Sequence, residues 1–201
     1  ISANEDDGTI TVTASLDNSV QGGFSVDVST IDGTATISDG DYGAVTSETL
    51  TFTGTAGETQ TFSILPTTDL KVEADETLTV SQGNLSATSL SVDITDGATV
   101  TINNDDAATI TIADGQGVEA DGTITIVATL DNPVQGGFVI NATTLDGTAV
   151  AATDFTALTD AAVATFTGTA GETQNIVLTI TDDMIGEDIE AFTVTLTSVS
   201  G

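Results

Sequence analysis

The sequence contains two similar copies of one long segment, and this internal repeat limits the folds open to the chain more than any other feature. Residues 8–35 match residues 122–149 at 18 of 28 positions when the offset is 114. The segment Thr51–Gln60 (TFTGTAGETQ) recurs without change at Thr165–Gln174. A period above 100 residues far exceeds the roughly 20–50 residues of a solenoid repeat, so each copy must be a domain with its own core. We therefore predict two tandem domains, repeat 1 over residues 1–106 and repeat 2 over residues 107–201.

Within each copy, apolar residues alternate with Thr and Ser in short runs. In residues 9–16 the apolar positions are Ile10, Val12, Ala14 and Leu16. A period of two is typical of strands with one buried and one solvated face. Further runs of this kind in copy one cover residues 24–31, 48–53, 60–65, 77–81, 90–94 and 99–103. About seven short strands per ~100 residues predict an all-β fold, with each copy an antiparallel Ig-like β-sandwich.

The two copies meet in a short acidic linker without a Pro- or Ser-rich spacer. One predicted strand ends at Asn103, the next begins near Thr109, and Asp105 and Asp106 lie between them. Copy one has no counterpart of residues 108–114, and copy two has no counterpart of residues 99–103. We therefore expect repeat 1 to lack its N-terminal strand and repeat 2 its C-terminal strand, as in an internal piece of a longer array.

The charge balance argues against several functions. The chain has 31 Asp and Glu residues, a single basic residue (Lys71) and no His, for a net charge of −30. Nucleic-acid binding and docking on anionic lipid both need Lys and Arg, so neither is expected. Without a His base, a Cys nucleophile or a cluster of cations, we expect no enzyme. No apolar stretch reaches the ~18 residues of a membrane span, so no membrane insertion is expected.

The carboxylates cluster at the ends of predicted strands. In copy two, five acids lie within residues 182–190, and copy one has an acidic run at 69–76 in the corresponding place. Loops that gather at one pole of a sandwich would bring these charges together, where they repel unless a cation neutralises them. Oxygen donors without nitrogen or sulfur ligands favour Ca²⁺. Solvated turns, or an acidic surface adapted to saline conditions, would give a similar composition, and composition alone leaves these interpretations open.

Three segments of copy two resemble the Calx-beta motif, namely residues 147–155 (GTAVAATDF), 166–173 (FTGTAGET) and 182–194 (DDMIGEDIEAFTV). The resemblance implies a β-sandwich with calcium held at one pole by loop carboxylates. Carried over by motif, the implied calcium ligands are Glu5, Asp41, Asp69, Glu73, Glu76, Asp105 and Asp106 in copy one, and Glu119, Asp154, Asp182, Asp183, Glu187 and Glu190 in copy two.

Copy one departs from this motif at two positions. Thr68 stands where copy two has Asp182, and Lys71 adds a positive charge inside the acidic loop. One ligand is lost and a competing cation is gained. We therefore expect copy one to hold a weaker calcium site than copy two.

The amino-acid sequence of the repeats is similar to the repeat sequences of giant secreted bacterial surface adhesins, including those of gliding-motility machinery. This similarity implies a calcium-binding structural repeat of a long extracellular stalk, in which Ca²⁺ rigidifies the domains and the joint. Its partners would be neighbouring repeats of the same chain and a cell-surface or extracellular polysaccharide, and its location the bacterial cell surface. Two alternatives stay open: a carbohydrate- or protein-binding adhesion module, and a regulatory calcium sensor. Internal repetition favours the stalk, because a ligand site would tend to distinguish one copy.

Overall fold

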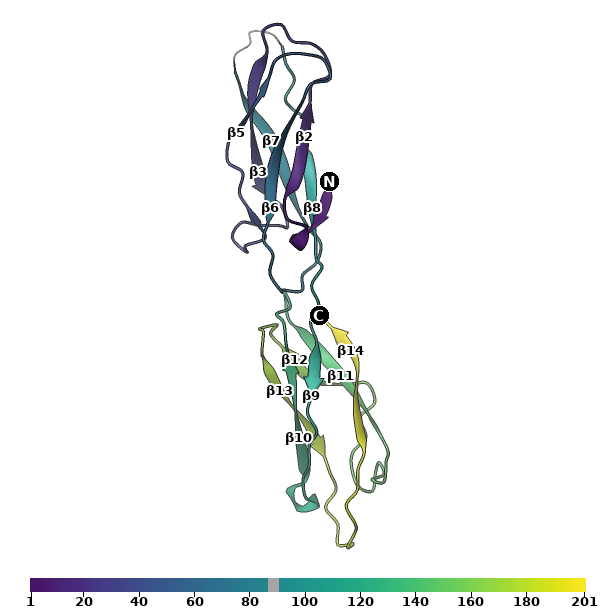
Figure 1. The fold of residues 1–201 in the computed structure, drawn as a ribbon. Helices are drawn as coiled ribbons and strands as arrows, with labels where there is room; N and C mark the ends of the chain where they lie inside the picture. Colours follow the sequence, from purple (N-terminus) through teal and green to yellow (C-terminus); the bar gives the residue numbers. More distant parts are fainter. Residues whose placement is uncertain (87–90) are drawn as a thin grey trace. The chain divides into compact units, whose positions relative to one another are not determined.

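The chain folds into two compact units. The structure is a computed structural model that describes residues 1–86 and 91–201. Unit 1 comprises Ile1–Asp69 and Glu73–Asp106, and unit 2 comprises Leu70–Val72 and Ala107–Gly201. Figure 1 shows the strands of each unit, and the two units are described separately below.

Unit 1 contains two sheets. Its elements are β1 (Ser2–Asn4), a 3-10 turn η1 (Glu5–Asp7), β2 (Ile10–Ser15), β3 (Phe24–Asp32), β4 (Tyr42–Gly43), β5 (Glu48–Phe52), β6 (Thr59–Pro66), β7 (Glu76–Ser86) and β8 (Ala98–Asn103). One sheet has the order β1-β8-β7-β3-β5 and the other the order β2-β6-β4.

Unit 2 repeats most of this plan. Its elements are β9 (Ile110–Ile112), a 3-10 turn η2 (Glu119–Asp121), β10 (Thr123–Leu130), β11 (Phe138–Leu145), β12 (Ala161–Phe166), β13 (Thr173–Thr179) and β14 (Thr193–Ser200). The sheets have the orders β12-β11-β14 and β13-β10-β9. The predicted all-β fold is confirmed, since the only helical elements among the described residues are the two three-residue 3-10 turns.

Two details of the strand prediction were wrong. Residues 91–94 form no strand, although Val92 and Ile94 pack against the core of unit 1, and Leu90 lies outside the described residues. The alternation therefore correctly indicated that one face of this segment is buried. Burial alone does not give the segment a neighbouring strand with which to form backbone hydrogen bonds. The sheets are also not wholly antiparallel, because β1 pairs with β8 in parallel register, with Asn4 opposite Asn103.

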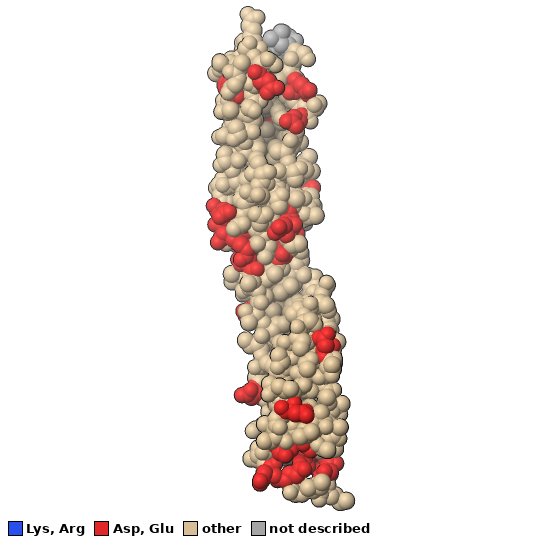
Figure 2. Space-filling view, turned by 90° about the vertical axis from the view of Figure 1, so that its right-hand side faces the viewer, with Lys and Arg blue, Asp and Glu red and all other residues tan. Residues whose placement is uncertain are grey.

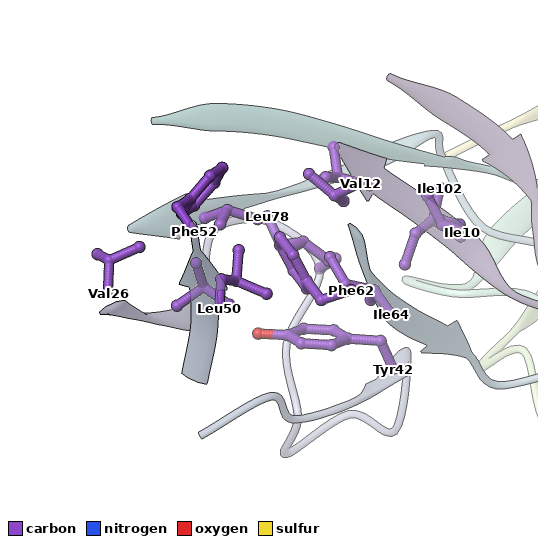
Figure 3. Close-up of a cluster of buried hydrophobic side chains, with 14 of the residues drawn as sticks. Ile10, Val12, Val26, Tyr42, Leu50, Phe52, Phe62, Ile64, Leu78 and Ile102 are labelled. Atoms are coloured by element: carbon purple, nitrogen blue, oxygen red, sulfur yellow. The ribbon is translucent and has the colours of Figure 1, made fainter. Parts of the chain in front are cut away.

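The core of unit 1 lies between its two sheets (Figure 3). Ile10 and Phe62 of one sheet and Phe52 and Leu78 of the other are among the buried side chains shown there. These residues occupy the inward positions of the period-two pattern, which explains why the alternation in the sequence predicts the core. Unit 2 has the same arrangement, and its stacked pair Phe138 and Phe166, with ring centroids 5.2 Å apart, corresponds to Phe24 and Phe52 in unit 1 at 5.0 Å.

The identical segment TFTGTAGETQ forms a turn that needs its glycine. Gly168 has φ of +91°, and a Cβ there would overlap the backbone carbonyl oxygen of Val134. The carboxylate of Glu172 accepts hydrogen bonds from the backbone N–H of Thr167, Gly168 and Thr169. These N–H donors lower the pKa of Glu172 to about 2. The structural role of this turn therefore explains why its sequence is identical in both copies, and no bound ligand is needed to account for it.

In the described part of the chain, neither helical turn has the length or the apolar character needed to cross a lipid bilayer.

Candidate metal centre

Carboxylates converge at three places in the described residues. In each group, one oxygen from each of three residues lies within 4.8 Å of the others. Two groups belong to unit 1 and one to unit 2. They are Glu5 with Asp105 and Asp106, Asp39 with Asp41 and Glu73, and Asp154 with Glu187 and Glu190. Figure 2 shows acidic side chains gathered in patches on the face in view, with large neutral areas between them.

The first group is assembled by the parallel pairing of β1 and β8. Because parallel strands end at the same edge of a sheet, the residues that follow the two strands come together. Glu5 directly follows β1, and Asp105 and Asp106 lie just beyond β8. Residues that are 100 positions apart in the sequence thus share one site.

Glu5 is the most enclosed acid of this group, with a side chain only 7% exposed. Burial, together with the nearby charges of Asp69, Glu73, Asp106 and Asp105, raises the pKa of Glu5 to about 7. A carboxyl group in this position is stabilised either by a proton or by a cation. The pKa of Asp105 is also raised, first by a hydrogen bond with Asp6.

The second group lies beside the first and is ordered by its own loops. The backbone N–H of Thr36 donates to Oδ2 of Asp41 at 2.6 Å, which fixes the loop that carries Asp39 and Asp41. The backbone N–H of Glu73 donates to Oδ1 of Asn104 at 2.9 Å. Since the charge of Glu73 also acts on Glu5, the two groups form one site. We call it the unit 1 acidic site; its members are Glu5, Asp39, Asp41, Asp69, Glu73, Asp105 and Asp106.

The third group is more open. The backbone N–H of Val150 donates to Oδ2 of Asp154 at 2.6 Å, the counterpart of the Thr36–Asp41 bond. Desolvation raises the pKa of Glu187, and the charges of Glu190, Glu119, Asp154 and Asp183 add to this effect. The pKa of Glu190 is raised by desolvation and by Asp154. We call these residues the unit 2 acidic site: Glu119, Asp154, Asp183, Glu187 and Glu190.

Eleven of the 13 implied ligands thus lie in one of the two acidic sites. Glu76 lies outside the three groups, at the start of β7, where it is 9% exposed and stands opposite Ile102 in the register. Asp182 is exposed and also lies outside them.

Asp39 is a site residue that the sequence analysis missed. It stands two residues before Asp41, a spacing that could have signalled a second carboxylate in the same loop. The comparison of the copies concealed it, because the corresponding residue of copy two is Ala152.

The two acidic sites differ in burial. The unit 1 acidic site contains the buried Glu5, whereas every residue of the acidic loop 182–190 in unit 2 is exposed. In unit 1, Asp105 and Asp106 of the segment after β8 lie beside Glu5. Leu70–Val72, which includes Lys71, is grouped with unit 2, where Val72 bridges to Val134.

Both sites fit a hard divalent cation better than any catalytic chemistry. The donors are all carboxylate oxygens, the ligands that Ca²⁺ prefers, and several of them converge. Burial first, and then neighbouring carboxylates, raise the pKa values of Glu5, Glu187 and Glu190, so both effects disfavour the charged form of these groups. A bound calcium ion would supply that missing positive charge.

In chelator, the chain should be more stable at pH 5 than at pH 8. The folded-state pKa of Glu5 is about 7, above the usual value of 4.5. The folded state therefore binds the proton more tightly than the unfolded state, and this contribution to stability is lost as pH rises from about 4.5 to 7. Thermal melts across this range test the sign. Glu5→Gln should flatten the pH dependence, and an unchanged slope in that variant would place its origin elsewhere.

Comparison with known proteins gives one family. The chain matches the Calx-beta domain over residues 1–106 and again over residues 103–201. Among curated protein sequences, none matches the chain.

Solved structures similar to the chain include CBD12 from CALX1.2, with 22% identity and a TM-score of 0.45 over 98% of this chain and 77% of that one. The calcium binding domain CBD12 of CALX1.1 is similar at 22% identity and a TM-score of 0.45, over 99% of this chain and 77% of that one. The apo-form Calx CBD1 domain matches 52% of this chain and 89% of its own, at 27% identity and a TM-score of 0.41.

Proposed function

The chain belongs to the Calx-beta domain family, and we propose that it is a calcium-binding structural repeat of a long extracellular stalk of the bacterial adhesin type. The observation that carries the calcium assignment is the buried Glu5, which is surrounded by the charges of Asp69, Glu73, Asp105 and Asp106. Clustered carboxylates are unfavourable at such a position, and calcium lowers the penalty while using the oxygens as ligands.

The proposed ligands are the members of the two acidic sites. In unit 1, Asp41 already has Oδ2 engaged by Thr36, so it offers its other oxygen to an ion. In unit 2, Asp154 is in the same position through Val150. Calcium would link residues from separate loops in each unit, and so would hold η1 or η2 against the loops that follow β3 and β6 or β11 and β13.

The stalk assignment rests on the joint and on the repetition. Only residues 104–109 separate the end of β8 from the start of β9, and they include two members of the unit 1 acidic site. If Asp105 and Asp106 bind the same ion as Glu5, the first half of this linker is fixed to unit 1. A fixed linker suits a rigid stalk, and a free one suits a loose tether.

Small-angle scattering tests whether calcium stiffens the joint. We expect one well-defined maximum dimension in calcium and a broader distribution of dimensions in chelator, because repulsion among the same acids would free the linker. Asp105→Asn with Asp106→Asn should give the chelated profile even in calcium, while each unit stays folded by circular dichroism. Identical wild-type scattering in both conditions would show that metal does not set the geometry of the joint.

We further propose that the partners are neighbouring repeats and a cell-surface or extracellular polysaccharide, at the bacterial cell surface. The strong similarity between the two copies supports a role shared by many repeats. The reading frame of the whole gene tests this proposal. Many such repeats behind a secretion signal are expected, and a pair of repeats inside a membrane transporter would contradict it.

A further inference from the structure

The second half of the linker is attached to unit 2 by hydrogen bonds between protein groups. The linker comprises residues 104–109, between the end of β8 and the start of β9. The backbone N–H of Thr109 donates to Oδ1 of Asp131 at 2.6 Å, and the backbone N–H of Asp131 donates to the carbonyl oxygen of Thr109 at 3.1 Å. The side-chain Nδ2 of Asn132 donates to the carbonyl oxygen of Ala107 at 2.8 Å. Two neighbouring residues of the turn after β10 therefore hold both ends of the segment 107–109.

The position of this turn follows from the pairing of β9 with β10. Leu130, the last residue of β10, stands opposite Ile110, so the next residue along the chain, Asp131, faces Thr109. The backbone N–H groups of Thr109 and Asn132 both donate to Oδ1 of Asp131, and they lower the pKa of this carboxyl. The charged form of Asp131 is therefore the form that holds the linker.

The first residue of the linker is held to unit 1 in a similar way. The backbone N–H of Asn104 donates to Oδ1 of Asp75 at 3.1 Å. Its side-chain Oδ1 accepts a hydrogen bond of 2.9 Å from the backbone N–H of Glu73, and its Nδ2 donates to the carbonyl oxygen of Asp106 at 3.1 Å. The linker is thus tied at Asn104 to unit 1 and at residues 107–109 to unit 2.

Asp105 and Asp106 lie between these two attachments. Both belong to the unit 1 acidic site, where they lie within 4.8 Å of Glu5, measured between carboxylate oxygens. Asp105 also shares a hydrogen bond with Asp6. An ionised carboxylate can only accept hydrogen bonds, so this bond requires a proton on one of the two acids. When the acids are ionised and no cation is bound, repulsion opposes the packing of Asp105 and Asp106 on unit 1.

We propose that Asp131 and Asn132 are positioning residues that fix the second half of the linker without metal, so that calcium has only Asp105 and Asp106 left to order. The role of calcium in this proposal rests on the proposed function, and the role of Asp131 and Asn132 does not. Without these two residues, an ion in the unit 1 acidic site would order the linker no further than Asp106, and residues 107–109 would still move. A stiff joint therefore needs both the ion and the turn after β10.

Backbone ¹⁵N relaxation of the full chain tests the proposal residue by residue, because residues 104–109 contain no Pro. In chelator at pH 7.5, we expect order parameters of about 0.85 for Ala108 and Thr109, and of about 0.6 or below for Asp105 and Asp106. The amide of Ala108 is informative because it shares a peptide plane with the carbonyl that Asn132 binds.

The test variant is Asp131→Ala with Asn132→Ala. In chelator, the order parameters of Ala108 and Thr109 should fall to about 0.6 or below, because both ends of the segment lose their partners. Saturating calcium should raise the values of Asp105 and Asp106 to about 0.85 in the wild type, and it should leave Ala108 and Thr109 disordered in the variant.

The matched control is Asp17→Ala with Asn18→Ala, because the tripeptide Leu-Asp-Asn also stands in the turn after β2 of unit 1. This control should leave Ala108 and Thr109 ordered. The conservative variant Asp131→Asn keeps an acceptor oxygen, so it should restore much of the order that Asp131→Ala removes.

The state of the turn itself is read from Leu130 and Val134, whose N–H groups donate to the carbonyl oxygens of Glu172 and Gly168. Both should stay ordered in the double variant. If they do not, Asn132→Ala alone decides, since it removes the side-chain bond to Ala107 and should still lower the order parameter of Ala108.

Two results would overturn the positioning role of Asp131 and Asn132. One is a mobile Ala108 and Thr109 in the wild type in chelator, and the other is an ordered Ala108 in both the double variant and Asn132→Ala. Failure of the proposed function would look different. Asp105 and Asp106 would then be unaffected by calcium, while the order of Ala108 and Thr109 would still depend on Asp131 and Asn132.

Discussion

Calcium at 1 mM is expected to raise the melting temperature of the chain by about 5–10 °C over chelator. If the dissociation constant is ~0.1 mM, as for many extracellular calcium modules, linkage adds about 1.4 kcal/mol to the free energy of unfolding of each unit. A domain of about 100 residues gains about 4–8 °C per kcal/mol. The measurement is a thermal melt by circular dichroism at a constant ionic strength.

The matched control replaces calcium with magnesium at the same concentration. Magnesium demands near-octahedral geometry and keeps its waters, so it should stabilise the chain much less. Equal effects of both ions would indicate general screening of the net charge of −30 rather than a site. No effect of calcium would remove the basis of the proposed function.

The second large effect should come from Glu187→Gln combined with Glu190→Gln. In chelator, this variant should melt several degrees above the wild type, because desolvation and, after it, repulsion from neighbouring carboxylates disfavour the charged form of both residues and raise their pKa values. In calcium, the order should reverse, because two ligands are gone. A substitution that stabilises the metal-free form and weakens the metal-bound form is the signature of a cation site.

Asp188→Asn is the control for this variant. Asp188 lies in the same exposed loop but outside the three carboxylate groups. It should change either melt by no more than about 2–4 °C, as is usual for surface substitutions, and it should not reverse sign between chelator and calcium. If Asp188→Asn and the double variant behave alike, net charge rather than a localised site accounts for both.

Much of the fold could be predicted from the sequence, because the physical signals are local. The alternation at Ile10, Val12 and their successors marks inward positions directly, and the 114-residue repeat marks two domains. The same alternation also contained a signal that the sequence analysis did not use. Glu76 shares its parity with Leu78 and Val80, so a period of two places it on the buried face of β7, as the structure shows.

Most of the acidic residues of the sites could be predicted from the sequence, but the strand pairing that brings them together could not. That Asp105 and Asp106 meet Glu5 depends on the parallel pairing of β1 with β8, a contact between chain segments about 100 residues apart. No local pattern encodes that pairing.

Equilibrium dialysis against calcium, at pH 7.5 and a fixed ionic strength, tests the central claim most directly. The account predicts saturable binding in the ~0.1–1 mM range, with at least one ion in each unit. It also predicts that Glu5→Gln lowers the stoichiometry or affinity of one class of sites, and that Glu187→Gln with Glu190→Gln lowers that of another. Binding that rises linearly with calcium and is the same in all three proteins would contradict it, because only a diffuse ion atmosphere around the acidic surface would then remain.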